Sequence, residues 1–151
     1  MIRSATDDST AAVEVANQLR PTLLRLSREL RRETETLGIT SRQATLLWLI
    51  REHSGLNLRE LAALERISAP SLSGHVDRLE RVGLIERVRS GDDRRRVGLV
   101  LTDEGARLLR RVRARRTTWL AERIEALEPD EVEAIERALE PLHRLLDEDD
   151  A

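Results

Sequence analysis

The stretch from Asn57 to Thr102 reads NLRELAALERISAPSLSGHVDRLERVGLIERVRSGDDRRRVGLVLT, and it decides the fold. Its first half predicts two short helices joined by a tight turn. Asn57 and Glu60 form a cap pair that opens a helix over 58–65. Ser68 caps the second helix, which carries a proline in its first turn and ends at Gly83. A helix, a short turn and a second helix make the helix-turn-helix pattern.

The second half of the stretch predicts a β-hairpin. Residues 84–89 and 97–101 are strand-like, and the sequence Ser-Gly-Asp-Asp between them is typical of a turn. Five arginines gather on these strands and their tip: Arg87, Arg89, Arg94, Arg95 and Arg96. A solvated charge run would instead spread both signs evenly. A basic hairpin directly after a helix-turn-helix indicates a wing whose arginines enter a DNA minor groove.

The helix predicted at 68–82 has one polar face and one apolar face, which carries Leu72, Val76, Leu79 and Val82. Its outward side is expected to carry small hydroxyls and longer polar side chains: Ser71, Ser73, Gly74, His75, Asp77 and Arg78. Small residues near the N-terminus allow a helix to lie deep in a major groove, where serine bonds base edges or phosphate. An ordinary helical hairpin with a polar face remains the alternative for the helix pair taken alone.

Helices are predicted on both sides of this stretch. An apolar stripe from Thr10 to Leu37 predicts a long amphipathic helix, which Pro21 should kink or divide. Thr40 and Gln43 form a capping box for a helix that ends near His53. After Thr102 a helix runs to about residue 127, and a last one spans 130–146. The fold class is therefore mostly α with a small β-hairpin, and the organisation expected is 1–39, 40–105 and 106–151.

The net charge of −2 for 151 residues hides a strong asymmetry. Residues 56–118 hold 15 Arg against 9 acidic residues, whereas residues 120–151 hold 3 Arg against 12. Every basic residue other than histidine is arginine. A basic middle and an acidic end suggest that only the middle of the chain meets a polyanion.

Composition also limits the chemistry. The chain has no cysteine, which removes disulfides, thiol redox sensing and cysteine-based zinc sites. The three histidines are scattered along the chain, so no metal site is expected. The sequence also has no Gly-rich phosphate loop and no nucleophile elbow, so neither a cofactor nor an enzymatic activity is expected. No apolar run approaches membrane-spanning length, and the first residues lack the apolar core of a secretory signal. A cytoplasmic protein is expected.

Several short motifs occur together in a specific order. They are Leu61-Ala62, Val76-Asp77-Arg78-Leu79-Glu80, Gly83-Leu84-Ile85-Glu86-Arg87, Asp93-Arg94-Arg95 and Leu101-Thr102-Asp103-Glu104-Gly105. In this combination residues 40–109 resemble the winged-helix core of MarR-type transcriptional regulators. The resemblance implies a homodimer, built from the first and last helices, that binds a palindromic operator in double-stranded DNA, most often as a repressor. A winged helix that docks proteins instead of DNA is the alternative.

The resemblance also implies roles for particular residues. Asp93 would brace the wing while Arg95 enters the minor groove, with Arg94 beside it. The residues expected at DNA are Ser68, Ser71, Ser73, Gly74, His75, Arg78, Asp93, Arg94 and Arg95. Many members carry an arginine where this chain has Gly74, so no operator sequence can be carried over. Small, often aromatic anions act as effectors in this family, and Trp48 and Trp119 are the residues that could line such a pocket.

Overall fold

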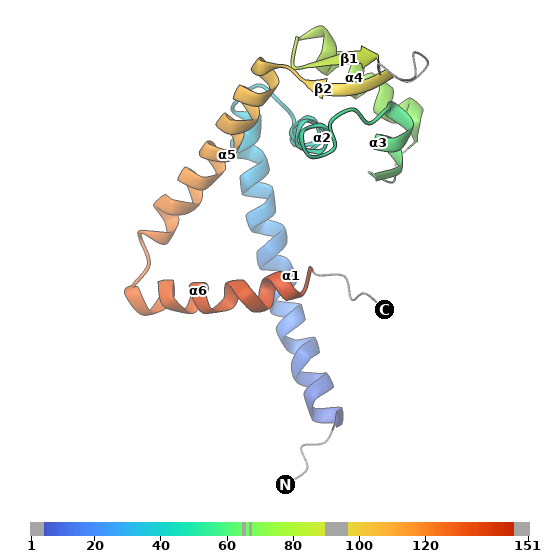
Figure 1. Ribbon diagram of the computed structural model, residues 1–151. Helices are drawn as coiled ribbons and strands as arrows, with labels where there is room; N and C mark the ends of the chain where they lie inside the picture. Colours follow the sequence, from blue (N-terminus) through green and yellow to red (C-terminus); the bar gives the residue numbers. More distant parts are fainter. Residues whose placement is uncertain (1–4, 65, 67, 90–96, 147–151) are drawn as a thin grey trace. The chain divides into compact units, whose positions relative to one another are not determined.

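The computed structural model describes residues 5–64, 66, 68–89 and 97–146, with side chains from Thr10 onward (Figure 1). The described elements are α1 (Ala5–Glu35), α2 (Ser41–Glu52), α3 (Leu58–Leu64), α4 (Ala69–Arg81), β1 (Ile85–Arg89), β2 (Val97–Leu101), α5 (Asp103–Ile124) and α6 (Pro129–Arg144). The prediction of a mostly α fold with a small hairpin is confirmed. The chain divides into two compact units, Met1–Arg116 and Thr117–Ala151, and α5 passes through the boundary.

The helix starts of the first unit follow from local capping. Thr40 Oγ1 accepts the Gln43 amide at 3.2 Å, and the Gln43 side chain accepts the Thr40 amide at 3.0 Å. The same reciprocal pattern opens α3, where Asn57 Oδ1 accepts the Glu60 amide and Glu60 Oε2 accepts the Asn57 amide. Both cap pairs predicted from the sequence are confirmed. Each satisfies amides that a helix start leaves without a partner.

The core of the first unit lies between α2, α3, α4, the hairpin and the start of α5. Its least exposed side chains are Leu46, Leu47, Ile50, Leu61, Leu72, Val76, Leu79 and Ile85. These residues recur at helical spacing in α2 and α4, so each helix turns one apolar face inward. Burial of each large side chain contributes about 1.5–3 kcal/mol. The core therefore fixes α4 by its buried face, and the opposite face lies at the surface.

The hairpin is joined to the helices by a third backbone segment. β1 and β2 pair antiparallel, with Ile85 opposite Leu101 and Arg89 opposite Val97. On its other side β2 bonds the segment before α3: the Gly55 amide donates to Leu99 O at 3.0 Å, and the Leu99 amide donates to Leu56 O at 2.9 Å. Gly98 lies at this crossing, where an added Cβ would overlap the Gly55 backbone.

Gly98→Ala is therefore expected to destabilise the fold. Because the obstacle is backbone rather than a movable side chain, the cost should be about 2 kcal/mol or more in the free energy of unfolding. Gly74→Ala is the matched control, since nothing lies within 4 Å of the added methyl. In the middle of a helix that change should stabilise by about 0.5–1 kcal/mol. Urea unfolding of both variants checks the pair, and equal midpoints would contradict the assigned packing.

Helix α1 is one continuous helix, which corrects the alternative that Pro21 begins a second segment. A proline inside a helix leaves the carbonyl four residues earlier without its usual amide partner. Here that carbonyl belongs to Asn17, and Pro21 and its neighbours are exposed, so water can hydrate the carbonyl. Thr22 Oγ1 also donates to Gln18 O at 3.2 Å in the same turn. Continuing the helix therefore costs little here.

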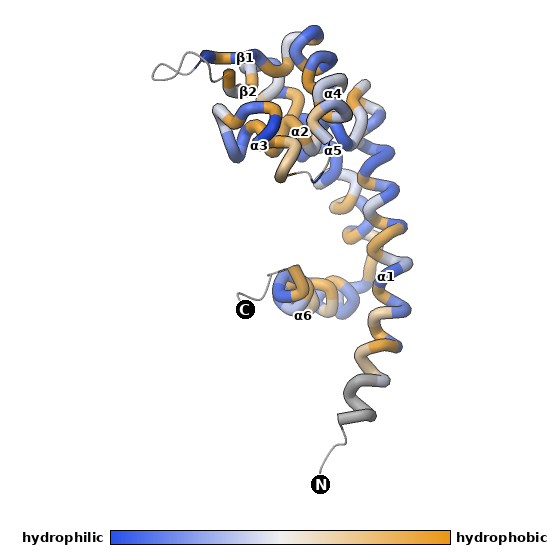
Figure 2. The backbone as a smooth tube through the Cα atoms, turned by 90° about the vertical axis from the view of Figure 1, so that its right-hand side faces the viewer, coloured by the Kyte–Doolittle hydropathy of each residue, from blue (hydrophilic) through white to orange (hydrophobic). Residues whose placement is uncertain are grey.

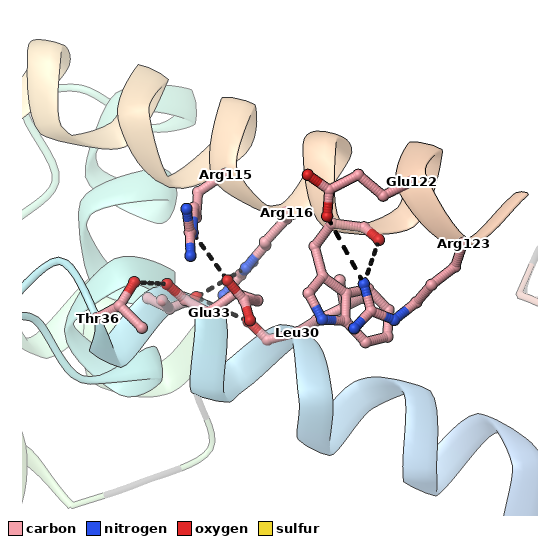
Figure 3. Close-up of polar contacts among 9 residues, drawn as sticks. Leu30, Glu33, Thr36, Arg115, Arg116, Glu122 and Arg123 are labelled. Atoms are coloured by element: carbon pink, nitrogen blue, oxygen red, sulfur yellow. Dashed lines mark hydrogen bonds and ion pairs between the residues drawn. The ribbon is translucent and has the colours of Figure 1, made fainter. Parts of the chain in front are cut away.

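The C-terminal end of α1 is tied to α5 by two arginines (Figure 3). Arg115 Nε donates to Glu33 Oε2 at 2.8 Å, and Arg116 Nε donates to the hydroxyl of Thr34 at 2.8 Å. Thr34 is fully buried, and its own hydroxyl donates to Leu30 O at 3.1 Å. Burial lowers the pKa of Arg116, although the guanidinium remains charged. Within the first unit, these bonds fix where α5 leaves the winged core.

The second unit contains the end of α5 and helix α6. The Arg123 guanidinium stacks over the Trp119 ring at 3.7 Å and donates to the Trp119 carbonyl at 2.9 Å. α6 begins at Pro129, where the Glu131 carboxylate accepts the Glu128 amide at 2.9 Å. The sequence predicted a last helix over 130–146, so its bounds shift by one or two residues. No helix in the described ranges is long and apolar enough to span a membrane.

Candidate nucleic-acid interface

Helix α4 carries the residues predicted to read DNA. Its buried face consists of Leu72, Val76 and Leu79, each with no exposed surface. On the other side Ser71, Gly74 and Arg78 are exposed, while Ser73, His75 and Asp77 are partly exposed. The predicted outward residues therefore all lie on the surface side of α4.

One residue of the predicted apolar face does not follow the pattern. Val82 was expected to pack with Leu72, Val76 and Leu79, yet its side chain is 60% exposed. Helix α4 ends at Arg81, and Val82 is its C-cap with Gly83 following at a φ of +76°. The chain turns away there to enter the hairpin, so the helical spacing that predicted burial no longer applies.

The N-terminus of α4 presents two serine hydroxyls. Ser68 Oγ accepts the Ser71 amide at 3.4 Å and donates to Ser71 Oγ at 2.8 Å. Pro70 occupies the first turn, where a missing amide hydrogen costs nothing. Both serines are exposed. A helix N-terminus with free amides and hydroxyls is suited to bind phosphate oxygens.

Asp77, in contrast, is paired with side chains of the same chain, although it is partly exposed. The Arg87 guanidinium on β1 donates to Asp77 Oδ1 at 2.7 Å and also to a Glu80 carboxylate oxygen. Ser73 Oγ donates weakly to Asp77 Oδ2 at 3.4 Å. The hydrogen bond from Arg87 is the main reason that the pKa of Asp77 lies below its usual range. The carboxylate is therefore ionised at any pH where DNA binding is measured.

Arg87 is one of the five hairpin arginines expected in the minor groove, because all of them share one short segment. The network shows that its guanidinium pairs with two carboxylates of α4. The structure directs Arg87 to α4, whereas Arg89 is exposed and makes no ion pair with a described residue. Asp77 and Glu80 stand three residues apart on a helix, the spacing of neighbours on one face. That spacing was visible in the sequence, but the strand opposite it was not.

The predicted wing residues Asp93, Arg94 and Arg95 lie outside the described residues. The same holds for Arg96 and for the turn between the strands. The described part of the hairpin places both strand ends, Arg89 and Val97, opposite each other in the ladder.

The two tryptophans proposed for an effector pocket belong to different units. Trp48 lies on α2 in the first unit and is 46% exposed. Trp119 lies on α5 in the second unit and is buried, with Arg123 stacked over it. His53 and His143 are exposed at helix ends. Among the described residues no group of three His, Cys, Asp or Glu side chains could hold a metal ion.

A helix-turn-helix followed by a two-stranded hairpin defines a winged helix. The family model described as the MarR family matches residues 39–97. The HTH-type transcriptional repressor MdtR of Bacillus subtilis is 31% identical over 104 residues, which cover 69% of this chain and 67% of MdtR. An uncharacterized HTH-type transcriptional regulator of Mycobacterium bovis is 28% identical and matches 89% of this chain and 94% of that protein.

Solved structures of MarR family proteins match the fold of this chain. A MarR family protein from Bacillus stearothermophilus matches with a TM-score of 0.76 and 28% identity, over 91% of this chain and 96% of that one. A Staphylococcus aureus MepR mutant bound to an oligodeoxyribonucleotide shares the fold, with a TM-score of 0.70 and 23% identity over 87% and 97% of the chains. This chain belongs to the MarR family of winged helix-turn-helix transcriptional regulators. The family resemblance inferred from the sequence is confirmed.

Proposed function

We propose that the chain acts as a homodimeric repressor that binds a palindromic operator and is released by a small anionic or aromatic ligand. The general class, a DNA-binding transcriptional regulator, follows from the family. Repression is supported by the name of the relative MdtR, a transcriptional repressor.

The observation that carries the proposal is the two-sided burial of α4. Leu72, Val76 and Leu79 fix the helix to the core, and the opposite row of small and polar side chains meets no other part of the described first unit closely enough to be buried. We assign base and phosphate contacts in the major groove to this row. Its members are Ser68, Ser71, Ser73, Gly74, His75 and Arg78.

The hairpin would complete the DNA contact in the flanking minor groove. Arg94 and Arg95 are assigned there, with Asp93 as the brace, on the strength of the sequence motif alone. A narrow minor groove has an enhanced negative potential that attracts arginine. Residues 40–105 thus form the proposed DNA-binding core, and residues 1–39 and 106–151 the proposed dimerisation segments.

The dimer is supported by apolar surface that the described chain leaves uncovered. None of the residues of α6 is buried, although Ile135 and Leu139 stand four apart on one face and are 41% and 48% exposed. α1 likewise exposes large apolar side chains: Val13, Val15, Leu23, Leu24 and Leu26. Figure 2 shows hydrophobic and hydrophilic stretches alternating along α1. Amphipathic helices of this kind gain stability when a partner covers the apolar face.

A two-fold dimer sets the geometry of the operator. Two copies of α4 would enter successive major grooves on one side of the duplex, with half-sites about 34 Å apart. A ligand can release the DNA only by favouring a different spacing of the two helices. We assign a ligand-contacting role to Trp48 on α2 and, separately, to Trp119 on α5.

Arg78→Ala tests the assignment of α4. Arg78 is exposed on the proposed DNA face, so its loss should weaken operator binding by about tenfold to 100-fold. The operator is first selected from a random duplex library by the wild-type protein, and affinities follow from fluorescence anisotropy. Arg42→Ala, an exposed arginine at the start of α2, is the control and should leave the affinity unchanged. Equal effects of both changes, or a wild-type protein that selects no DNA, would favour a protein-docking winged helix.

A further inference from the structure

The hairpin and α4 are held together by two different kinds of contact. At its base, Leu84 and Ile85 are buried in the core, and the Leu84 amide donates to Leu79 O at 3.0 Å. Thr102 Oγ1 closes the same end by donating to Gly83 O at 2.6 Å. Beyond Ile85, every residue of β1 is exposed. Apolar packing therefore fixes β1 only at its start, whereas β2 is held farther along by the buried side chain of Leu99 and by its bonds to Gly55 and Leu56.

Arg87 supplies the contact farther out. Its Nη2 donates to Asp77 Oδ1 at 2.7 Å, and its Nη1 donates to Glu80 Oε2. Among described residues, these are the ion pairs between β1 and α4. A planar guanidinium that bonds two carboxylates one helical turn apart restricts its strand in two directions at once. A single point charge would restrict it less.

The same contact reduces an electrostatic obstacle. Asp77 and Glu80 are acidic residues on the helix proposed to enter a groove lined by phosphates, which would repel them. Arg87 bonds both carboxylates, and its single positive charge offsets one of their two negative charges. Both terminal nitrogens of Arg87 are thereby engaged with carboxylates of α4.

We propose that Arg87 is a positioning residue. By bonding Asp77 and Glu80, it fixes the wing relative to α4, and it makes no phosphate contact. The inference rests on the proposed DNA-binding function of α4 and the hairpin. Arg89 provides the matched comparison, because it lies two residues further along β1, on the same face of the strand. It makes no ion pair with a described residue and remains available for phosphate.

The salt dependence of operator binding separates the two roles. A lost phosphate contact lowers the slope of log K against log salt by about one, whereas a lost positioning contact weakens binding without that change. Arg87→Ala is expected to reduce the affinity for the selected operator by about tenfold and to keep the wild-type slope. Arg89→Ala should reduce the slope by about one. Combining Arg87→Ala with Asp77→Ala and Glu80→Ala should cost little more than Arg87→Ala alone, since all three changes break one contact.

A measurement on the DNA-free protein keeps the inference independent of operator binding. Residual dipolar couplings of backbone N–H groups report the orientation of β1 and β2 relative to α4. In Arg87→Ala the hairpin couplings should be reduced while those of α4 are retained, and thermal unfolding should change little because exposed ion pairs contribute little stability. Unchanged couplings, a slope lowered by about one in Arg87→Ala, or full recovery of affinity by Arg87→Lys would each overturn the proposal. If the wild-type protein bound no operator while its hairpin kept its residual dipolar couplings, that result would instead count against the proposed function.

Discussion

The double substitution Ile135→Asp/Leu139→Asp is expected to convert the protein to a monomer and to lower operator affinity by about 1,000-fold. Both side chains are exposed on one face of α6, so replacing them disrupts no buried packing among the described residues. In a dimer the same positions would be covered, and two carboxylates placed there would lose hydration without a partner. The loss of affinity follows because each copy then binds one half-site without the other.

Sedimentation velocity measures the first effect, and fluorescence anisotropy on the selected operator measures the second. Arg137→Asp is the matched control, since it changes the net charge by the same −2 but lies on the opposite face of α6. The exposed pair of Arg137 with Glu133, at 3.6 Å, contributes little to stability. A double variant that stays dimeric would remove α6 from the dimer interface. Unaltered circular dichroism must accompany either result.

Gly74→Glu is expected to abolish operator binding without harming the fold. An added Cβ at Gly74 meets nothing within 4 Å, so the longer side chain has room in the free protein. Glutamate also favours the helix by roughly 0.5 kcal/mol over glycine. At the centre of the proposed DNA face, however, the new carboxylate would oppose the phosphates and weaken binding by about 100-fold or more.

Thermal unfolding and anisotropy on the same preparation separate the two effects of Gly74→Glu. The control is Gly74→Ala, which adds the Cβ without the charge and should raise the unfolding midpoint. If Gly74→Glu bound the operator within about twofold of the wild-type affinity, the exposed face of α4 would not be the DNA face. If it failed to fold, the open space around Gly74 would have been assigned wrongly.

Much of the fold follows from local chemistry that the sequence displays. The capping pairs at Thr40 and Asn57 set the starts of α2 and α3 because side-chain oxygens there satisfy free amides. Ser68 starts α4 in the same way, and Gly83 ends it with a positive φ. These signals involve residues within four positions of each other, so a single sequence is enough to find them.

Other features depend on neighbours that are distant in sequence. The continuity of α1 through Pro21 depends on the exposure of the surrounding turn, which no local pattern reveals. The pairing of Arg87 with Asp77 and Glu80 depends on where β1 crosses α4. Charge alone could not separate Arg87 from Arg89, since both are arginines on one strand. The roles of Asp93, Arg94 and Arg95 stay predictions, as these residues lie outside the described ranges.

The measurement that tests the central proposal most directly is the stoichiometry and salt dependence of binding to an operator selected from random duplexes. A dimeric winged-helix regulator is expected to select a palindromic sequence and to saturate at two chains per duplex, with half-sites about one helical turn apart. Its affinity should fall steeply as salt is raised, because several arginines displace counterions. Selection of no common sequence, or saturation at one chain per duplex with an asymmetric site, would contradict a dimeric winged-helix regulator.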